Sequence, residues 1–194
     1  DVNPVIEGQS PTTGMPVSGD SLYMPMLVQI SNPEGSVKVD GKNVTAAGVG
    51  QRAPWGGQYA DIVYEGILYR SGQTRITFLY NDSFAEGQPL SAGPVRSARI
   101  GHVLLREEWQ GALAFGSTMG GGDLGDAVER LKADSAAAFD IVDIRRGGLG
   151  GRLKGVKAPS NLSVDVNALQ ARVAADSIAR PFAFSDAAAA RGAG

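Results

Sequence analysis

The sequence predicts a single α+β domain in which layered, mixed β-sheets pack against helices. Its 194 residues suit one domain, and its 43% apolar content is enough to build a core at this size. Strand-like runs that pair locally are interspersed with helix-like segments, which is the pattern of an α+β protein. The 27 glycines, about twice ordinary usage, indicate many tight turns.

Strand signals dominate the first half of the chain. Residues 26–31 (MLVQIS) form an apolar run of strand length. Residues 37–44 (VKVDGKNV) alternate around an Asp-Gly pair, which is typical of a small hairpin. Residues 61–80 contain two runs rich in β-branched and aromatic side chains with Ser-Gly between them, and we expect a larger β-hairpin there.

The second half mixes helices and strands. A turn-rich connection over residues 88–94 leads into a predicted amphipathic helix, residues 97–110. In that helix Ile100, Val103 and Leu104 fall on one side, whereas Arg99, His102 and Arg106 fall on another. The other expected elements are strands at 112–115 and 139–144, helices at 123–133 and 166–176, and a glycine-rich basic loop at 145–155.

The ends of the chain differ in composition from its middle. Residues 1–19 are rich in Pro, Gly, Ser and Thr and are expected to be an irregular N-terminal segment. Residues 20–184 are expected to form the domain. Residues 185–194 (SDAAAARGAG) have the composition of a linker, which predicts a further C-terminal domain beyond it.

Composition argues against several kinds of partner. The net charge of −2 argues against nucleic acid, which requires a basic face, and against electrostatic attraction to a membrane surface. Without cysteines, disulfides and thiolate metal sites are excluded. No run approaches the roughly 20 apolar residues of a membrane helix. We therefore expect no metal, no cofactor and no nucleic acid.

Two charged segments are the strongest functional signal. Asp61 and Glu65 are spaced so that both carboxylates point the same way on a strand or a helix. Arg96 and Arg99 stand at the predicted start of a helix, where positive charge opposes the helix dipole at about 0.3–1 kcal/mol each. The compensation is either internal, from Asp61 and Glu65, or an anionic ligand.

Other motifs carry less weight. Gly120, Gly122 and Gly125 spell the dinucleotide-binding pattern GxGxxG, but glycine is frequent here and we attribute the match to chance. His102, the only histidine, is expected to be a solvated or hydrogen-bonded helix residue. Trp55 and Trp109 could line a ring-binding cleft, although each is more often a core or rim residue.

Five motifs occur in an order that resembles the YerB-like lipoproteins, a family of unknown function. They are PTTGMPV (11–17), ADIVYEG (60–66), TR (74–75), GPVRSAR (93–99) and KAPSNL (157–162). The resemblance implies a layered α+β fold and an extracytoplasmic protein of the bacterial envelope, held to the membrane only through a lipidated cysteine upstream of this chain. Carried over by motif, the implied ligand-binding residues are Asp61, Glu65, Arg75, Arg96, Ser97, Arg99 and Asn161.

Three functions follow as hypotheses. The first is a monomeric binding module, in which the arginines hold a polar or anionic ligand such as a glycan, a peptide carboxylate or another cell-wall component. The second is a structural or protein-interaction module of the envelope. The third, least favoured, is an envelope hydrolase that uses Asp61 or Glu65 as its general acid or base.

Overall fold

The computed structural model of the protein describes residues 8–10, 12–16, 24–32, 36–39, 42–45, 54–67, 74–81, 90–116, 141–156, 158, 160–172 and 182. The strands are β1 (Met26–Ser31), β2 (Ser36–Val39), β3 (Lys42–Thr45), β4 (Ile62–Ile67), β5 (Thr74–Tyr80), β6 (Ser91–Ala92), β7 (Ala112–Phe115), β8 (Ile141–Asp143), β9 (Gly150–Arg152) and β10 (Leu162–Asp165). The helices are α1 (Ile100–Trp109), α3 (Ile144–Gly147), α4 (Val166–Gln170) and the short 3₁₀ turn η1 (Gly57–Tyr59).

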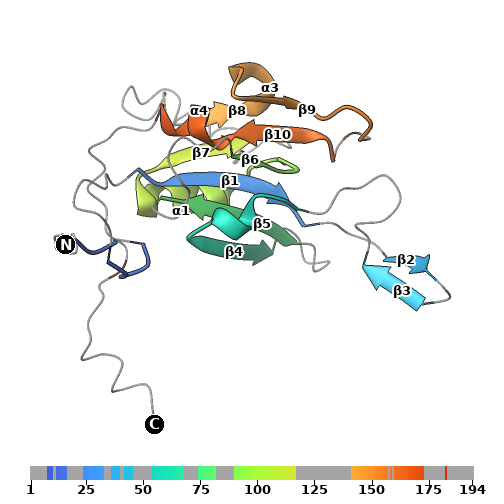
Figure 1. Ribbon diagram of the computed structural model, residues 1–194, viewed down its shortest axis with the longest axis horizontal. Helices are drawn as coiled ribbons and strands as arrows, with labels where there is room; N and C mark the ends of the chain where they lie inside the picture. The colour runs from blue at the N-terminus through green and yellow to red at the C-terminus, as the bar shows by residue number, and fades with distance from the viewer. Residues whose placement is uncertain are drawn as a thin grey trace, which may run out of the picture.

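These strands form a five-stranded sheet in the order β4-β5-β1-β7-β8, a three-stranded sheet in the order β6-β10-β9, and the hairpin β2-β3. The large sheet is mixed, because β1 pairs antiparallel with β5 and parallel with β7. Figure 1 shows the three-stranded sheet lying above the large sheet, with α1 behind it. The predicted α+β class with layered mixed sheets is therefore confirmed.

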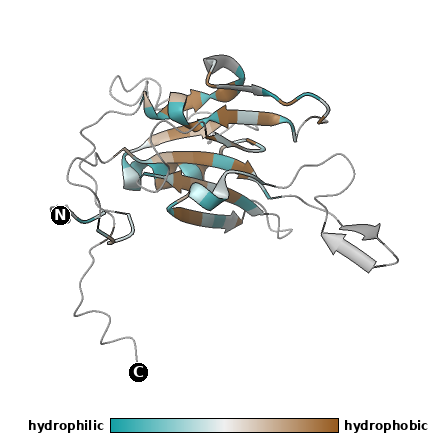
Figure 2. Cartoon of the chain, in the orientation of Figure 1, coloured by the Kyte–Doolittle hydropathy of each residue, from teal (hydrophilic) through white to brown (hydrophobic). Residues whose placement is uncertain are grey.

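Strand β1 lies at the centre of the large sheet and is buried along its whole length. Met26, Val28 and Ile30 pack into one core, which the three-stranded sheet and α4 cover with residues such as Val164 and Leu169. Successive side chains of a strand point to opposite faces. Leu27 accordingly packs into the second core, under α1. Burial on both faces explains why β1 is mostly apolar, and Figure 2 shows it brown along most of its length, with a hydrophilic section.

The strand predictions were accurate where a run was strongly apolar or carried a turn signal. The predicted strands 26–31 and 112–115 have the same bounds as β1 and β7. The predicted hairpins at 37–44 and 61–80 correspond to the antiparallel pairs β2-β3 and β4-β5. The strand expected at 139–144 is found as β8 over its described residues, except that Ile144 already belongs to α3; residues 139–140 lie outside the described residues.

The segment 93–99 differs from the prediction. Helix α1 begins at Ile100, so Arg99 is its N-cap and Arg96 lies outside the helix. The backbone of Arg96 is tied to the sheet, because its N–H donates to the Gln29 carbonyl at 2.8 Å and its carbonyl accepts from the Gly116 N–H at 2.8 Å. These long-range hydrogen bonds hold the segment extended beside β1. The predicted cost of placing Arg96 at the positive end of the helix dipole therefore does not arise.

The predicted apolar face of the helix was right for Val103, which is buried, and wrong for Ile100 and Leu104, which are 47% and 59% exposed. His102, expected to be solvated or hydrogen-bonded, is hydrogen-bonded to the Arg99 backbone and only 8% exposed. Trp109 is fully buried and fixes the rotation of the helix, with Val103 beside it in the second core. The largest aromatic side chain has the most area to bury, and it therefore decides which face of α1 meets the sheet.

Of the remaining predictions, some agree with the structure in part and others lie outside the described residues. The connection expected over 88–94 contains β6, and the loop expected over 145–155 contains part of α3 and all of β9. The helix expected over 166–176 is described as α4, which ends at Gln170, while residues 173–176 lie outside the described residues. The helix expected at 123–133 and the glycine motif at 120–125 also lie outside them.

Candidate cavity between strand β4 and helix α1

A cavity of about 520 Å³ lies between β4 and the first turns of α1. Its lining comes from two predicted site residues, Glu65 and Arg99, and from eight residues that the sequence did not single out as site residues. These are Tyr64, Gly66, Ile67, Thr77, Ile100, Gly101, His102 and Leu105. Each of the two charged segments predicted from the sequence therefore contributes one residue to the lining of this cavity.

His102 joins Arg99 at the wall formed by α1. Its Nδ1 accepts a hydrogen bond from the backbone N–H of Arg99 at 2.8 Å. In a neutral imidazole one nitrogen accepts and the other donates, so this bond leaves Nε2 as the N–H donor of the ring. Burial, together with the positive charges of Arg75 and Arg99, lowers the pKa of His102 to about 4. The ring is therefore neutral at physiological pH.

Arg99 forms the cationic part of the wall. Its Nη1 donates to the Ala98 carbonyl at 2.9 Å, which holds the guanidinium beside the start of the helix. A guanidinium has five N–H donors and no acceptor, so Arg99 cannot cap α1 as Ser or Asp would. The first turn of α1 also contains no acidic residue. Positive charge is therefore concentrated at the positive end of the helix dipole.

The floor beneath this end of α1 is polar. Thr77 Oγ1 donates to Gln29 Oε1 at 3.0 Å, and Nε2 of Gln29 is buried without a hydrogen-bond partner among the described residues. Arg75, on the same strand as Thr77, is also buried, and Arg96 Nε donates to Ser31 Oγ at 3.4 Å. The sheet face is thus apolar under Trp109 and polar under His102.

The two carboxylates have separate surroundings. Glu65 Oε1 accepts from Asn32 Nδ2 at 2.9 Å and from Thr74 Oγ1 at 2.6 Å. Asp61 Oδ2 accepts from the Asn81 backbone N–H at 2.6 Å, and Asp61 does not line the cavity. Four residues of strand separate their backbones by roughly 13 Å at about 3.3 Å per residue. Asp61 immediately precedes β4, whereas Glu65 lies within the strand, so the two carboxylates are held at different places along it.

The other predicted residues lie outside the cavity wall. Arg96 and Ser97 belong to the extended segment before α1, and Arg75 acts on the cavity through its charge near His102. Asn161 lies at the start of the three-stranded sheet, where its Oδ1 accepts from Arg152 Nη1 at 2.8 Å. Motif matching therefore gathered residues from more than one place in the fold.

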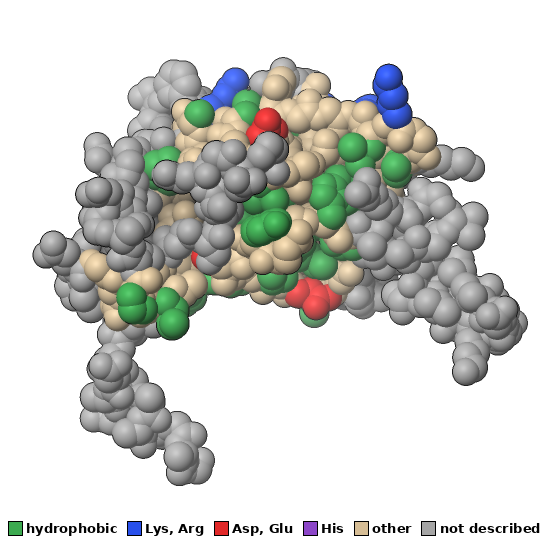
Figure 3. All heavy atoms as spheres, in the orientation of Figure 1, with side chains coloured by type: hydrophobic (Ala, Val, Ile, Leu, Met, Phe, Trp, Pro, Cys, Tyr) green, Lys and Arg blue, Asp and Glu red, His purple; other side chains and the backbone are tan. Residues whose placement is uncertain are grey.

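The basic stretch predicted as a loop contains part of helix α3 and strand β9. Arg145 forms an ion pair with Asp143 at 2.7 Å, and Arg152 bonds Asn161. In Figure 3 the Lys and Arg side chains visible on this face of the molecule lie at two separate places along its upper rim. The partner of Arg145 lies in β8 of the five-stranded sheet, whereas Arg152 belongs to β9 of the three-stranded sheet. Neither arginine lines the cavity beside β4.

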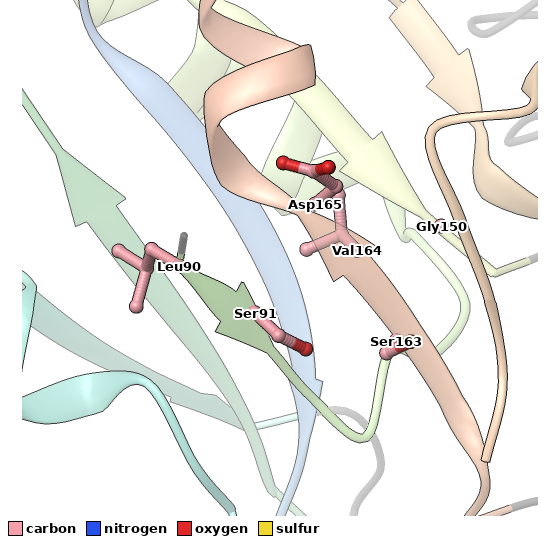
Figure 4. A pocket seen from close by; sticks show the side chains of 6 residues that line it. All are labelled: Leu90, Ser91, Gly150, Ser163, Val164 and Asp165. Atoms are coloured by element: carbon pink, nitrogen blue, oxygen red, sulfur yellow. The ribbon is translucent and has the colours of Figure 1, made fainter. Parts of the chain in front are cut away.

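A second cavity, of about 270 Å³, lies over β6 and β10. Figure 4 shows the residues that line it, which are Leu90, Ser91, Gly150, Ser163, Val164 and Asp165. The Ser91 hydroxyl accepts from Trp55 Nε1 at 3.2 Å, the Ser163 hydroxyl donates to the Gly151 carbonyl at 3.0 Å, and Asp165 caps α4. Its polar groups thus serve the fold, and we assign it no chemistry.

Within the described part of the chain, no group of three or more His, Asp or Glu side chains is arranged to hold a metal ion. Among the same residues, no helix has the length and apolar character needed to cross a bilayer. Among the described residues, polar groups come together around the open cavity beside β4, and the hydrogen-bond donors there are mainly N–H groups.

Comparison with known proteins agrees with this fold. Residues 12–179 match the N-terminal domain described as "Protein of unknown function (DUF3048)", and the chain therefore belongs to that family. The crystal structure of YerB protein from Bacillus subtilis is similar, with a TM-score of 0.61 and 23% sequence identity. The similarity covers 84% of this chain and 48% of YerB, so the chain spans about half the length of YerB. No curated protein matches. The resemblance deduced from the motifs is confirmed.

Proposed function

We propose that this domain is a binding module whose cavity between β4 and α1 receives an anionic group of a polar ligand. The observation that carries the proposal is the meeting of Arg99 and His102 in one cavity wall. Both present N–H donors, and both stand at the N-terminal end of α1. A guanidinium beside a helix N-terminus is a favourable environment for a carboxylate or a phosphate.

Electrostatics favour an anion over a cation at this wall. The charges of Arg75 and Arg99 both disfavour protonation of His102, which means that the local potential at the ring is positive. A neutral imidazole donates one hydrogen bond without adding a further charge. An anion bound there would accept from Arg99 and Nε2 of His102 while it neutralises the excess of positive charge.

Glu65 contributes less to the chemistry of the cavity than Arg99 and His102 do. Its carboxylate is held by Asn32 and Thr74, and its strand partner Ile76 packs against the core that faces away from α1. The donors at Arg99 and His102 form one cluster, so we expect a ligand that presents one anionic end to α1. The roughly 13 Å between the backbones of Asp61 and Glu65, at about 3.3 Å per strand residue, gives no support to a joint hydrolytic role.

The setting that we propose for this binding is the bacterial envelope, outside the cytoplasmic membrane, with a lipid anchor contributed by sequence upstream of residue 1. The support for it is the order of motifs shared with YerB-like lipoproteins and membership of the DUF3048 family. In that setting a glycan acid or a peptide carboxylate would be available as a ligand. Both carry the single anionic end that the cavity favours.

Thermal denaturation in the presence of acetate, phosphate, muramic acid and short peptides tests the proposal. A ligand at about 100 times its Kd stabilises the folded state by about 2.7 kcal/mol. For a domain of this size that raises Tm by several degrees, at roughly 2–4 °C per kcal/mol. We expect this rise with the wild type and with Arg145→Ala, a control in which a partly exposed arginine of α3 is removed.

Arg99→Ala should abolish the rise in Tm with little loss of stability, since Arg99 is half-buried at the rim of the fold. The structural alternative makes the opposite prediction. If no compound stabilises the wild type, and Arg99→Ala lowers Tm in the absence of any ligand, the cluster serves the fold and the binding proposal is wrong.

A further inference from the structure

We propose that the ligand of this cavity is an extended polypeptide with a free C-terminal carboxylate, which adds as a strand to the outer edge of β4. This inference rests on the proposed function and names its ligand class. The peptide backbone would pair with β4, and its terminal carboxylate would enter the wall formed by Arg99 and His102. Strand addition of this kind supplies affinity through main-chain hydrogen bonds.

Strand β4 is the end strand of the five-stranded sheet. It pairs with β5 over all six of its residues on one side, and no described strand pairs with its other side, as Figure 1 shows. Exposed edges are usually protected by Lys, Pro, bulges or short length. The sequence of β4, IVYEGI, contains no Lys and no Pro. Its edge is therefore suited to pairing with another chain.

The cavity lies alongside this strand. It is lined by four consecutive residues of β4, from Tyr64 to Ile67, and by Thr77 of β5 on the inner side. Because alternate side chains of a strand point to opposite faces, the backbone of β4 must contribute to this lining together with its side chains. The cavity and the open edge thus share the backbone of β4. Gly66 widens it, since no atom lies within 4 Å of where a Cβ would stand.

The groove that results has the chemistry of a peptide site. Ile67, Ile100 and Leu104 are 77%, 47% and 59% exposed, and two of them, Ile67 and Ile100, line the cavity. Apolar side chains of a bound peptide would remove this area from water, which is favourable. Arg99 and His102 provide the charge complementarity for the carboxylate. A free phosphate would use the donors alone and leave these apolar side chains in water.

A peptide has the distribution of charged and hydrogen-bonding groups that suits this cavity. A polypeptide has one anionic end, which matches the wall of α1, and amide groups along its length, which match the edge of β4. A second copy of this chain pairing through β4 is the competing occupant, and it would place no carboxylate beside Arg99.

The test uses random heptapeptides presented with a free C-terminal carboxylate and the same heptapeptides with a C-terminal amide. After selection on the wild type, Kd is measured for individual peptides by fluorescence anisotropy. We expect the amide form to bind about tenfold or more weakly, the scale of one lost charge-assisted hydrogen bond. Arg99→Ala should show a similar loss, whereas Arg145→Ala should leave Kd unchanged.

Hydrogen exchange then reports where the peptide lies. Binding should slow exchange of alternate amides of β4, which pair with no described strand on the open edge. Equal Kd for acid and amide forms, or unchanged exchange in β4, would overturn strand addition. A concentration-dependent dimer that protects β4 without peptide would overturn it in favour of self-association.

Acetate separates this inference from the proposed function. If acetate raises the Tm of the wild type but not that of Arg99→Ala, while no heptapeptide binds, the anion site stands and the peptide inference fails. If neither acetate nor any heptapeptide has an effect, both fail together.

Discussion

His102 provides the sharpest quantitative prediction, because its burial couples folding to pH. An ordinary histidine has a pKa of 6.5, whereas burial and two nearby arginines lower that of His102 to about 4. In acid the unfolded chain takes up a proton that the folded protein rejects, so protonation favours unfolding. This part of the stability is complete above pH 6.5 and is lost as pH falls towards 4.

The magnitude follows from the two pKa values. Between about pH 7.5 and about pH 4.5 the wild type should lose roughly 2 to 3 kcal/mol of unfolding free energy through His102 alone. The matched variant is His102→Gln, because a side-chain amide oxygen at this third helical position can still accept from the Arg99 N–H. The glutamine keeps the bond and removes the ionisation.

Urea denaturation of both proteins at the two pH values measures the effect. Carboxylates titrate in both proteins, so the difference between them isolates His102. Since the chain has a single histidine, its ring resonance in the NMR spectrum also gives the pKa of the folded state directly. Equal pH dependence in the two proteins, or a ring that titrates near 6.5, would refute the burial argument.

Two further predictions concern the fold around the cavities. Gly150→Ala would drive its Cβ into the Ser163 carbonyl oxygen across β9-β10, whereas Gly151→Ala meets nothing within 4 Å. The first should cost about 1–3 kcal/mol in urea denaturation and the second close to nothing; equal effects would contradict the pairing. Asp61→Ala should cost about 1–3 kcal/mol, because it leaves the buried Asn81 N–H without its 2.6 Å acceptor. Asp61→Asn, which keeps an acceptor oxygen, should lower the stability less than Asp61→Ala does. Calorimetry on both variants would show which one is less stable.

The sequence predicted elements whose signals are local. The run at residues 26–31 and the hairpin at residues 61–80 were found because hydrophobic pattern and turn residues act over a few positions. The start of α1 was missed because it depends on hydrogen bonds between Arg96, Gln29 and Gly116. Those residues are far apart in sequence, and no local pattern reveals their contact.

The site was predictable only in part for the same reason. Glu65 and Arg99 were singled out, and they do line one cavity. His102 was considered and set aside, although it is the third polar element of that wall. Its burial depends on which residues of β5 lie beneath α1, and here Thr77 and Arg75 make that floor polar. The one available signal was its position three residues after Arg99, where a side chain can accept from the N-cap.

The exposed edge of β4 likewise could not be predicted from the sequence. The run at residues 61–67 predicts a strand, but its place in a sheet depends on the order of all five strands. Only that order shows that one side of β4 has no described partner and that α1 lies beside it. We therefore propose the function from the way in which β4 and α1 lie beside each other, and no single sequence motif is enough to predict it.

The most direct test of the anion site is the ring signal of His102 during addition of sodium acetate at constant ionic strength and pH 7. The account predicts a saturable shift of the Nε2 and Cε1–H resonances in the wild type and in Arg145→Ala, and its absence in Arg99→Ala. A shift that is linear in acetate, or that persists unchanged in Arg99→Ala, would contradict the account.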